Sequence, residues 1–395
     1  IGKPPVSHSY LNIEAILDVA KQSGAEAVHP GYGLLSENAN FAKRVEEAGL
    51  TFIGPTSEVI EAMGSKLEAR KTMQQAGVPI VQGVNDPIAD ANEAAKIASE
   101  IGYPVMLKAS AGGGGIGMQL VHDEAELLKA FEGNQKRAQS FFGDGTMFIE
   151  KFIAQPHHVE VQIIADTHGN VVPVFERECS IQRRNQKVVE EAPSPFISEE
   201  TRQKMLDAAV EAAKHIGYTN AGTIEFLVDS EQSFYFLEMN TRLQVEHPVT
   251  EEITGIDLVE QQLKVATGEA LSFTRKDIQK KGHAIEVRIY AENPVSFFPS
   301  PGKIKHLQLP EGEGIRHEVA VETGSDVTPF YDPMIGKCIV FAATREEACA
   351  KLAEALRNYV VEGIETNIPM LLETVTHPQF LAGMTTTKFV EEYYL

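Results

Sequence analysis

Two short segments constrain the fold of this chain more than any other part of its sequence. Residues 223–229 (TIEFLVD) and 234–240 (FYFLEMN) are rich in β-branched and aromatic residues, and only four residues separate them. This composition and spacing predict two antiparallel strands joined by a tight turn. We expect the turn to be symmetric about Glu231 and Gln232.

The predicted pairing brings two glutamates together. Glu225 lies opposite Glu238, just as position 223 lies opposite 240 and position 227 lies opposite 236. Directly opposed carboxylates, about 5 Å apart at Cβ, would destabilise a sheet unless a positive charge neutralises them. Mg²⁺ suits this role because it prefers oxygen ligands and shares carboxylates with substrate phosphates. The alternatives are a solvated hairpin face or one carboxyl group with a raised pKa.

A row of polar residues follows the second strand. Alternation with less polar residues would place them on one side of an extended chain, and they are Asn240, Arg242, Gln244 and Glu246. Arg242 can bind a small oxyanion through two hydrogen bonds, and Glu246 is placed to act as a base. The row therefore predicts a polar pocket, although a solvated edge strand is the alternative.

A glycine-rich segment lies nearer the N-terminus. Residues 108–117 (KASAGGGGIG) contain five glycines, so backbone N–H groups there can surround a polyphosphate. The segment lacks the Gly-Lys-Ser/Thr ending of a P-loop, and a strand is expected after it, so neither a P-loop nor a dinucleotide fold is favoured. A flexible hairpin turn is the alternative. Lys108 ends the apolar strand that precedes the loop.

Lys66 offers an independent indication of an anion site. Ser65-Lys66-Leu67-Glu68 matches a capping box, which places Lys66 at the first position of a helix. A cation there opposes the helix dipole, and an anionic ligand would reverse that penalty. A solvated surface lysine is the alternative.

Composition excludes several classes of protein. The chain has 35 basic and 56 acidic residues, and its formal net charge of -21 would repel nucleic acid. It contains no apolar stretch of about 18 residues and opens without the apolar core of a signal peptide, so membrane insertion and secretion are not expected. Three scattered cysteines indicate neither a disulfide framework nor a zinc site. We expect a cytoplasmic protein.

Patterns of hydrophobicity divide the chain into three units. We expect a partial lobe over 1–64 that is incomplete at its N-terminal side, a linker helix with a small α+β lid over 65–152, and a large unit over 153–395. The helices are predicted over 13–22, 91–100, 198–216, 345–359 and 367–374, and the strands over 105–109, 118–122, 146–152, 158–165 and 170–176.

The order of these motifs resembles the ATP-grasp superfamily. The residues that carry this resemblance are Lys66, Lys108 with its glycine loop, residues 150–152 (EKF), Glu225 and residues 238–242 (EMNTR). Further motifs make the chain similar to biotin carboxylase, and they are residues 29–33 (HPGYG), 182–184 (QRR), 187–193 (KVVEEAP) and 244–251 (QVEHPVTE), together with Arg288. The resemblance extends over essentially the whole chain.

That resemblance implies a fold class of mixed α/β and α+β type. The expected architecture is an ATP-grasp fold with an incomplete N-terminal α/β lobe that lacks the family's first strands, a glycine-loop lid and a large C-terminal α+β domain. The last unit would combine the ATP-grasp catalytic core with the biotin carboxylase C-terminal domain.

The resemblance also implies a role for each site residue. ATP would contact Lys66, Lys108, Gly113, Gly114, Gly115, Gly117, Glu150, Lys151, the backbone of Ile153, His158 and Gln182. One or two Mg²⁺ (or Mn²⁺) ions would bind Glu225, Glu238 and Asn240. Bicarbonate would bind Arg242, Lys187 and the backbone of Val245, while Glu246 would deprotonate it and Arg288 would stabilise the enolate of biotin.

The implied reaction is the first half-reaction of a biotin-dependent carboxylase such as acetyl-CoA carboxylase. Bicarbonate would attack the γ-phosphate of ATP, and the resulting carboxyphosphate would deliver CO₂ to biotin. The biotin would be linked to a biotin carboxyl carrier protein, with a carboxyltransferase subunit as a further partner and a homodimer as the assembly. The rivals are another ATP-grasp ligase, of the carbamoyl-phosphate or purine-pathway type, and a non-catalytic nucleotide-binding assembly subunit.

Three positions depart from the family pattern. Ile116 stands where the family usually has arginine or lysine, Gln119 where arginine is common, and Asn185 where histidine is usual. These departures concern nucleotide affinity and lid closure more than the type of reaction.

Overall fold

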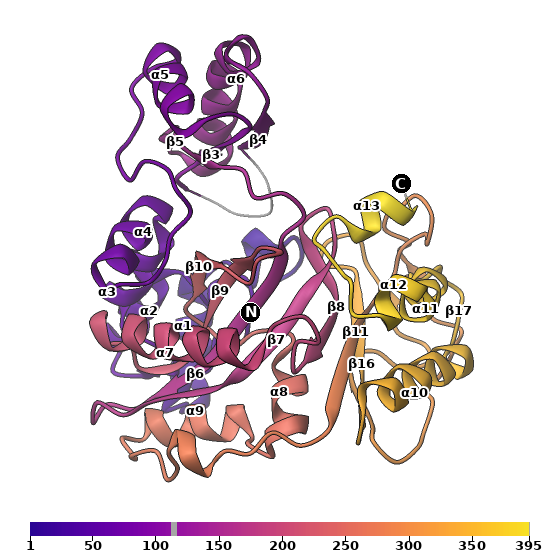
Figure 1. Ribbon diagram of the computed structural model, residues 1–395. Helices are drawn as coiled ribbons and strands as arrows, with labels where there is room; N and C mark the ends of the chain where they lie inside the picture. Colours follow the sequence, from indigo (N-terminus) through magenta and orange to yellow (C-terminus); the bar gives the residue numbers. More distant parts are fainter. Residues whose placement is uncertain (112–116, 395) are drawn as a thin grey trace.

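The computed structural model describes residues 1–111 and 117–394 (Figure 1). Its centre is an eight-stranded sheet in the order β10-β9-β6-β7-β8-β11-β16-β14, in which each neighbouring pair runs antiparallel. The strands are β10 (Phe234–Asn240), β9 (Asn220–Val228), β6 (His157–Ala165), β7 (Val171–Arg183), β8 (Gln186–Ala192), β11 (His283–Tyr290), β16 (Met334–Ala342) and β14 (Ile315–Val319).

The two faces of strand β6 in this sheet differ in the side chains that they present. On β6, Val159, Val161 and Ile163 pack with residues of helix α7 (Glu199–His215) into one hydrophobic core. Since successive side chains alternate between faces, His158 and Glu160 point away from that core. This part of the sheet thus buries apolar residues on the α7 side and presents His158 and Glu160 on the other, where Ile164, further along β6, packs into a second apolar cluster.

A separate three-stranded sheet, in the order β4-β3-β5, packs with two helices (Figure 1, top). Its elements are α5 (Ala91–Ile101), β3 (Val105–Ala109), β4 (Met118–Val121), α6 (Glu124–Phe142) and β5 (Met147–Lys151). We call the described residues of 91–151 the lid. The predicted strand over 105–109 is confirmed, and the other two strands are one or two residues shorter than predicted.

The N-terminal part combines helices with a two-stranded parallel sheet. Its elements are η1 (Val6–His8), α1 (Ile13–Ser23), β1 (Ala27–Val28), α2 (Ala39–Glu47), β2 (Thr51–Phe52) and α3 (Ser57–Gly64). The next helix, α4 (Lys66–Gln75), begins at Lys66 as predicted. The side chain of Ser65 caps it by accepting a hydrogen bond from the backbone N–H of Glu68.

The C-terminal part extends the central sheet and covers it with helices (Figure 1, right). These are α10 (Arg345–Asn358), α11 (Ile368–Thr376), α12 (Pro378–Leu381) and α13 (Phe389–Tyr394). The remaining elements are α8 (His247–Thr254), α9 (Leu258–Ala266), η2 (Arg275–Asp277) and the small sheets β12 (Gly302–Lys303) with β15 (Asp326–Val327) and β13 (His306–Gln308) with β17 (Val360–Glu362). Among the helices described, none combines the length and apolar character needed to cross a bilayer.

The hairpin agrees with the prediction at its functional end and differs near its turn. Glu225 pairs with Glu238, and residue 223 pairs with 240, as expected. The predicted pairing of 227 with 236 is wrong, because Leu227 pairs with Tyr235. A register shift between Phe236 and Glu238 adds one residue to β10 and thereby restores the predicted pairs.

The strand predicted beyond the hairpin is also wrong. Strand β10 ends at Asn240, residues 241–246 form a loop without regular structure, and α8 begins at His247. A second correction concerns β7, which was predicted over 170–176 but continues to Arg183. Its alternation is broken by register shifts on the β8 side between residues 178 and 182.

Candidate active site

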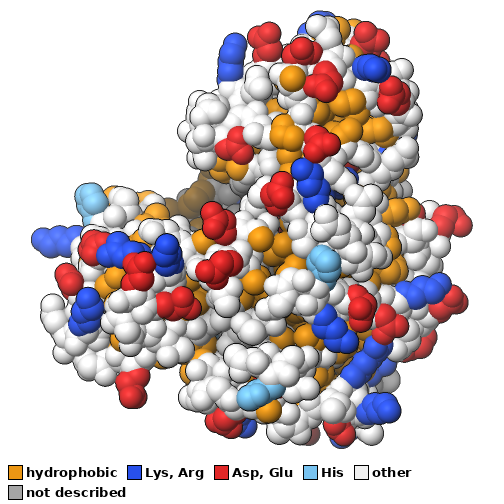
Figure 2. All heavy atoms as spheres, turned by 90° about the vertical axis from the view of Figure 1, so that its left-hand side faces the viewer, with side chains coloured by type: hydrophobic (Ala, Val, Ile, Leu, Met, Phe, Trp, Pro, Cys, Tyr) orange, Lys and Arg blue, Asp and Glu red, His pale blue; other side chains and the backbone are white. Residues whose placement is uncertain are grey.

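A cavity of about 570 Å³ lies between the lid and the polar face of the central sheet. Figure 2 shows a recess in the surface beneath the lid, which stands at the top of both views. The predicted site residues that line the cavity are Lys66, Lys108, Glu150, Lys151, Ile153, His158, Gln182, Lys187, Glu225, Glu238, Asn240, Arg242, Val245 and Arg288.

The other predicted site residues have different positions. Glu246 is fully buried and is not part of the lining. Gly117, also not part of the lining, has a φ of +76°, and a Cβ there would come within 2.8 Å of the Cβ of Ala109, so glycine is needed for the turn itself. Gly113, Gly114, Gly115 and Ile116 lie outside the described residues, so the phosphate-binding role of the loop stays a prediction.

Charged groups at the lid end of the cavity are paired with one another. Glu150 on β5 contacts Lys108 on β3, and its other oxygen accepts a hydrogen bond of 2.9 Å from Nη1 of Arg70. Arg70 also donates to the carbonyl of Val81 at 2.8 Å. Sequence reasoning missed Arg70, although its position four residues after Lys66 places both cations on one face of α4. Lys151 donates to the Gly102 carbonyl at 2.7 Å.

The paired glutamates of the hairpin have opposite electrostatic surroundings. Burial alone raises the pKa of Glu225, but the charges of Lys187 and His158 outweigh it and hold the pKa below its usual range. Burial and the charge of Glu225 raise the pKa of Glu238. Burial lowers the pKa of Lys66, and the charge of Glu238 opposes that shift.

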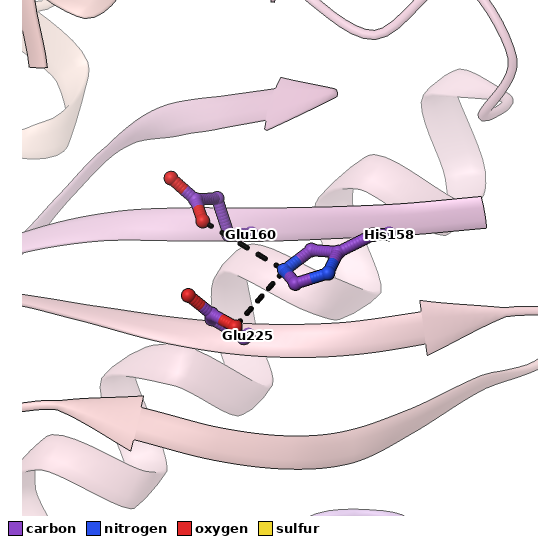
Figure 3. A group of neighbouring side chains, drawn as sticks. All are labelled: His158, Glu160 and Glu225. Atoms are coloured by element: carbon purple, nitrogen blue, oxygen red, sulfur yellow. Dashed lines mark ion pairs between the residues drawn. The ribbon is translucent and has the colours of Figure 1, made fainter. Parts of the chain in front are cut away.

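The side chains of His158 and Lys187 lie against Glu225, one of the predicted metal ligands. His158 Nε2 lies 3.0 Å from Glu225 Oε2, and it also faces Glu160 (Figure 3). Lys187 Nζ lies 2.8 Å from Glu225 Oε1, and Asn240 donates to the same oxygen at 2.7 Å. Facing carboxylates with an amide oxygen nearby form a hard donor set that fits Mg²⁺.

Lys187 on β8 is the electrostatic centre of the site. Its ammonium group contacts Glu160, Glu225 and Glu246, with a distance of 2.7 Å to Glu246 Oε1. Burial lowers the pKa of Lys187, but these three carboxylates raise it well above its usual value. Arg177, which is fully buried, supports the cluster from beneath through a 2.6 Å pair with Glu160.

The loop over 241–246 brings the predicted polar row together without being a strand. Arg242 donates to the side-chain oxygens of Asn240 at 2.8 Å and Gln244 at 3.1 Å. Gln244 in turn donates to Glu225 at 3.3 Å. Glu37, which sequence reasoning missed, accepts a 2.8 Å hydrogen bond from Nε of Arg242. The side chains therefore converge as predicted, although the backbone conformation differs.

Glu246 lies beneath the cavity between two cations. Its oxygens are 2.7 Å from Lys187 Nζ and 3.0 Å from Arg288 Nη2. Burial raises the pKa of Glu246, but Lys187, Arg288 and Arg177 together hold it well below its usual value. Arg288 also donates to Glu190 at 2.6 Å. Burial raises the pKa of Glu190 to about 7 even though Arg288 opposes that shift.

The basic run over 182–187 divides between the cavity and the core. Gln182 lies 2.9 Å from Nδ1 of His158, next to the cavity. Arg183 is buried against Glu292 at 2.6 Å, while Asn185 lines the cavity with a φ of +63°. Gln119, the second departure from the family pattern, accepts a hydrogen bond from Asn134 within the lid.

Three family models match successive parts of the chain. They are "Biotin carboxylase, N-terminal domain" over residues 1–60, "Carbamoyl-phosphate synthase L chain, ATP binding domain" over 65–274, and "Biotin carboxylase C-terminal domain" over 286–392.

Individual relatives match over the full chain. A biotin carboxylase from Halalkalibacterium halodurans is 64% identical, and the match covers 100% of this chain and 87% of that protein. The crystal structure of biotin carboxylase from Campylobacter jejuni in complex with β-γ-ATP has a TM-score of 0.97 at 47% identity, covering 100% of this chain and 88% of that one. The biotin carboxylase domain dimer of 2-oxoglutarate carboxylase from Hydrogenobacter thermophilus, in complex with MgADP, ADP and bicarbonate, has a TM-score of 0.96 at 48% identity, covering 99% and 86%.

Proposed function

The chain belongs to the biotin carboxylase family, and we propose that the cavity beneath its lid carries out the ATP-dependent carboxylation of biotin with bicarbonate as the carbon source. The ATP-grasp fold expected from the motifs is confirmed. The protein is an ATP-dependent ligase that uses ATP, Mg²⁺ and biotin.

The nucleotide occupies the side of the cavity that faces the lid. Lys66 and Lys108 bind its phosphates, while Glu150, Lys151 and the backbone of Ile153 contact adenine. His158 and Gln182, which lie side by side, contact the ribose. Glu225, Glu238 and Asn240 hold Mg²⁺, which supplies charge neutralisation at the phosphates.

Bicarbonate binds where Lys187 of β8, Arg288 of β11 and Arg242 of the loop over 241–246 line the cavity. Arg242, Lys187 and the backbone of Val245 hold it, and Glu246 accepts its proton. An oxygen of the deprotonated bicarbonate attacks the γ-phosphorus while the bond to ADP breaks, which gives carboxyphosphate and ADP. In the described structure Lys187 suppresses the basicity of Glu246. When the ammonium group of Lys187 turns from Glu246 to an anionic ligand, the pKa of Glu246 rises and Glu246 becomes a stronger base.

The second stage transfers CO₂ to biotin. Carboxyphosphate breaks into CO₂ and phosphate, and the phosphate takes the proton from the biotin nitrogen. Arg288 stabilises the enolate that forms, and the nitrogen then attacks CO₂. The observation that supports this proposal most strongly is the convergence of Lys187 and Arg288 on Glu246, with Arg242 beside them, in a chain whose net charge is -21.

The acceptor and the assembly follow from the same reaction. We propose that biotin arrives on a biotin carboxyl carrier protein and then passes its carboxyl group to a carboxyltransferase subunit. We also propose a homodimer, because a related domain forms one. The three cysteines are buried and unpaired, which supports a reducing cytoplasm.

Radiolabelled bicarbonate tests the proposed function directly. We expect ATP hydrolysis to require bicarbonate, biotin to accelerate turnover, and the label to appear on biotin. Label in carbamoyl phosphate instead would favour the rival ligase, and nucleotide binding without turnover would favour a non-catalytic subunit.

Replacing Glu238 with glutamine tests the metal site. The change keeps the shape of the side chain but replaces a charged oxygen ligand of Mg²⁺ with a neutral amide. We expect the Mg²⁺ concentration for half-maximal ATP turnover to rise about tenfold or more. Nucleotide binding without metal, measured by calorimetry, should stay unchanged. Equal Mg²⁺ dependence of the two proteins would contradict the assignment.

A further inference from the structure

A fully buried lysine lies in the sheet next to the site and has no part in the reaction described above. Lys337 on β16 is 1% exposed. It pairs across the strands with Arg288 on β11 and with Glu318 on β14. An ammonium group in such a position is costly unless charged or polar groups satisfy it. Its partners therefore indicate why it is there.

Lys337 holds a backbone group of the loop over 241–246. Its Nζ donates to the carbonyl oxygen of Val245 at 2.6 Å and lies 2.7 Å from Glu318 Oε2. A second carboxyl oxygen, Oε1 of Glu286, is 3.9 Å away. The carboxylate of Glu318 fixes the ammonium group, and the ammonium group fixes the carbonyl.

The loop depends on such contacts because it has no regular backbone hydrogen bonding of its own. At its start, Glu37 accepts a hydrogen bond of 3.0 Å from the backbone N–H of Thr241. At its end, Nδ1 of His247 lies 2.7 Å from the carbonyl oxygen of Gln244. Lys337 supplies the contact in between, at the carbonyl of Val245, the residue that links Gln244 and Glu246.

We propose that Lys337 is a positioning residue for bicarbonate, because its ammonium group fixes the Val245 carbonyl and thereby the loop that presents Arg242, Gln244 and Glu246. The proposal rests on the proposed function, since it assigns bicarbonate to this loop. A purely structural role, as a counter-ion for Glu318 and Glu286 in the core, is the alternative that the test must separate.

The replacement of Lys337 with methionine removes the donor and keeps a side chain of similar length. We expect the KM for bicarbonate to rise about tenfold or more, the effect of losing one charge-assisted hydrogen bond, while the KM for ATP changes less than about twofold. Hydrogen exchange of the amides over 241–247 should be faster than in the wild type. This second measurement does not depend on enzymatic activity.

A double variant separates the loss of the hydrogen bond from the loss of a counter-ion. Burial raises the pKa of Glu286 well above its usual value, so this carboxyl group can stay neutral without Lys337. Burial raises the pKa of Glu318, but the charges of Lys337 and Arg316 hold it below its usual value, so this carboxyl group is charged and keeps Arg316 as its one described ion pair when Lys337 is lost. The double variant Lys337→Met/Glu318→Gln removes that charge while the Val245 carbonyl still lacks its donor. It should recover thermal stability but keep the raised KM for bicarbonate and the faster exchange.

Arg202→Met is the matched control. Arg202 is also buried and forms a 2.8 Å pair with Glu176 on the α7 side of the sheet. We expect it to lower thermal stability without changing either KM. Parallel changes in both KM values for the Lys337 variants, or a normal KM for bicarbonate with normal exchange in the double variant, would overturn the positioning role. A wild type without bicarbonate-dependent turnover would instead refute the proposed function. The exchange measurement would still test whether Lys337 holds the loop through the Val245 carbonyl.

Discussion

Replacing Lys187 with methionine is expected to lower the rate of biotin carboxylation by about 10³-fold, the upper end of the effect of removing one preorganised electrostatic contact. The physical reason is the number of charges that depend on this ammonium group. It contacts Glu160, Glu225 and Glu246, all of which are buried. Without it, the mutual repulsion of these carboxylates is only partly offset by Arg177 and Arg288, and protons must be taken up.

The measurement is the transfer of labelled bicarbonate to biotin, with ATP binding followed by calorimetry. We expect ATP affinity without Mg²⁺ to change little, because Lys66 and Lys108 remain. Lys204→Met is the matched control, since Lys204 is an exposed lysine on α7 paired only with Glu200 among its described side-chain contacts. A carboxylation rate in the Lys187 variant equal to that of this control would contradict the central role of Lys187.

Local sequence patterns predicted the elements that carry the site because their causes are local. The cap at Ser65, the strand over 105–109 and the pair Glu225 and Glu238 follow from spacing and composition alone. The bulge in β10 shows the limit of such reasoning. The real turn is shifted by one position from the symmetric turn that was predicted. The extra residue near 237 cancels that shift, and only for this reason are the predicted partners at the functional end of the hairpin right.

The missed residues have partners far away in the sequence. Arg70 pairs with Glu150 across 80 positions, Glu37 with Arg242 across 205, and Lys337 with the Val245 carbonyl across 92. Nothing in the sequence near either partner reveals such contacts, because the fold creates them. They are nevertheless the contacts that hold the predicted site residues in place.

The basic run over 182–187 shows how one pattern divides into several roles. A run of this kind is usually a solvated surface. Here strand β7 directs Gln182 toward the cavity and Arg183 into the core, where its guanidinium lies 5.5 Å from the ring of Tyr290. The turn at residues 184 and 185 then reverses the chain, so that Lys187 on β8 enters the site. Charge alone could not separate these positions.

Glu246→Gln is expected to reduce bicarbonate-dependent turnover by about 10²–10⁴-fold, the usual contribution of a positioned general base. Glutamine keeps the hydrogen-bonding shape of the side chain but cannot accept the proton of bicarbonate. It also removes the carboxylate that lies between Lys187 and Arg288, so both cations lose a partner. ATP affinity should barely move, because the described side-chain contacts of Glu246 include Lys187 and Arg288 and none of the residues assigned to the nucleotide.

The pH dependence separates the base from a purely electrostatic role. In the described state the charges of Lys187, Arg288 and Arg177 keep the pKa of Glu246 below its usual value, so the carboxylate is ionised at neutral pH and can accept a proton. As the pH falls toward the pKa that Glu246 has during turnover, its base form is lost, and the acidic limb of the kcat/KM profile for bicarbonate should fall. We expect Glu246→Gln to remove that limb and to leave a low, flat rate, measured as labelled carboxybiotin across the acidic range at a constant concentration of the bicarbonate ion, so that protonation of the substrate itself does not contribute. A variant that kept the wild-type acidic limb at a reduced rate would show that another group accepts the proton and that Glu246 acts only by holding Lys187 and Arg288 in place.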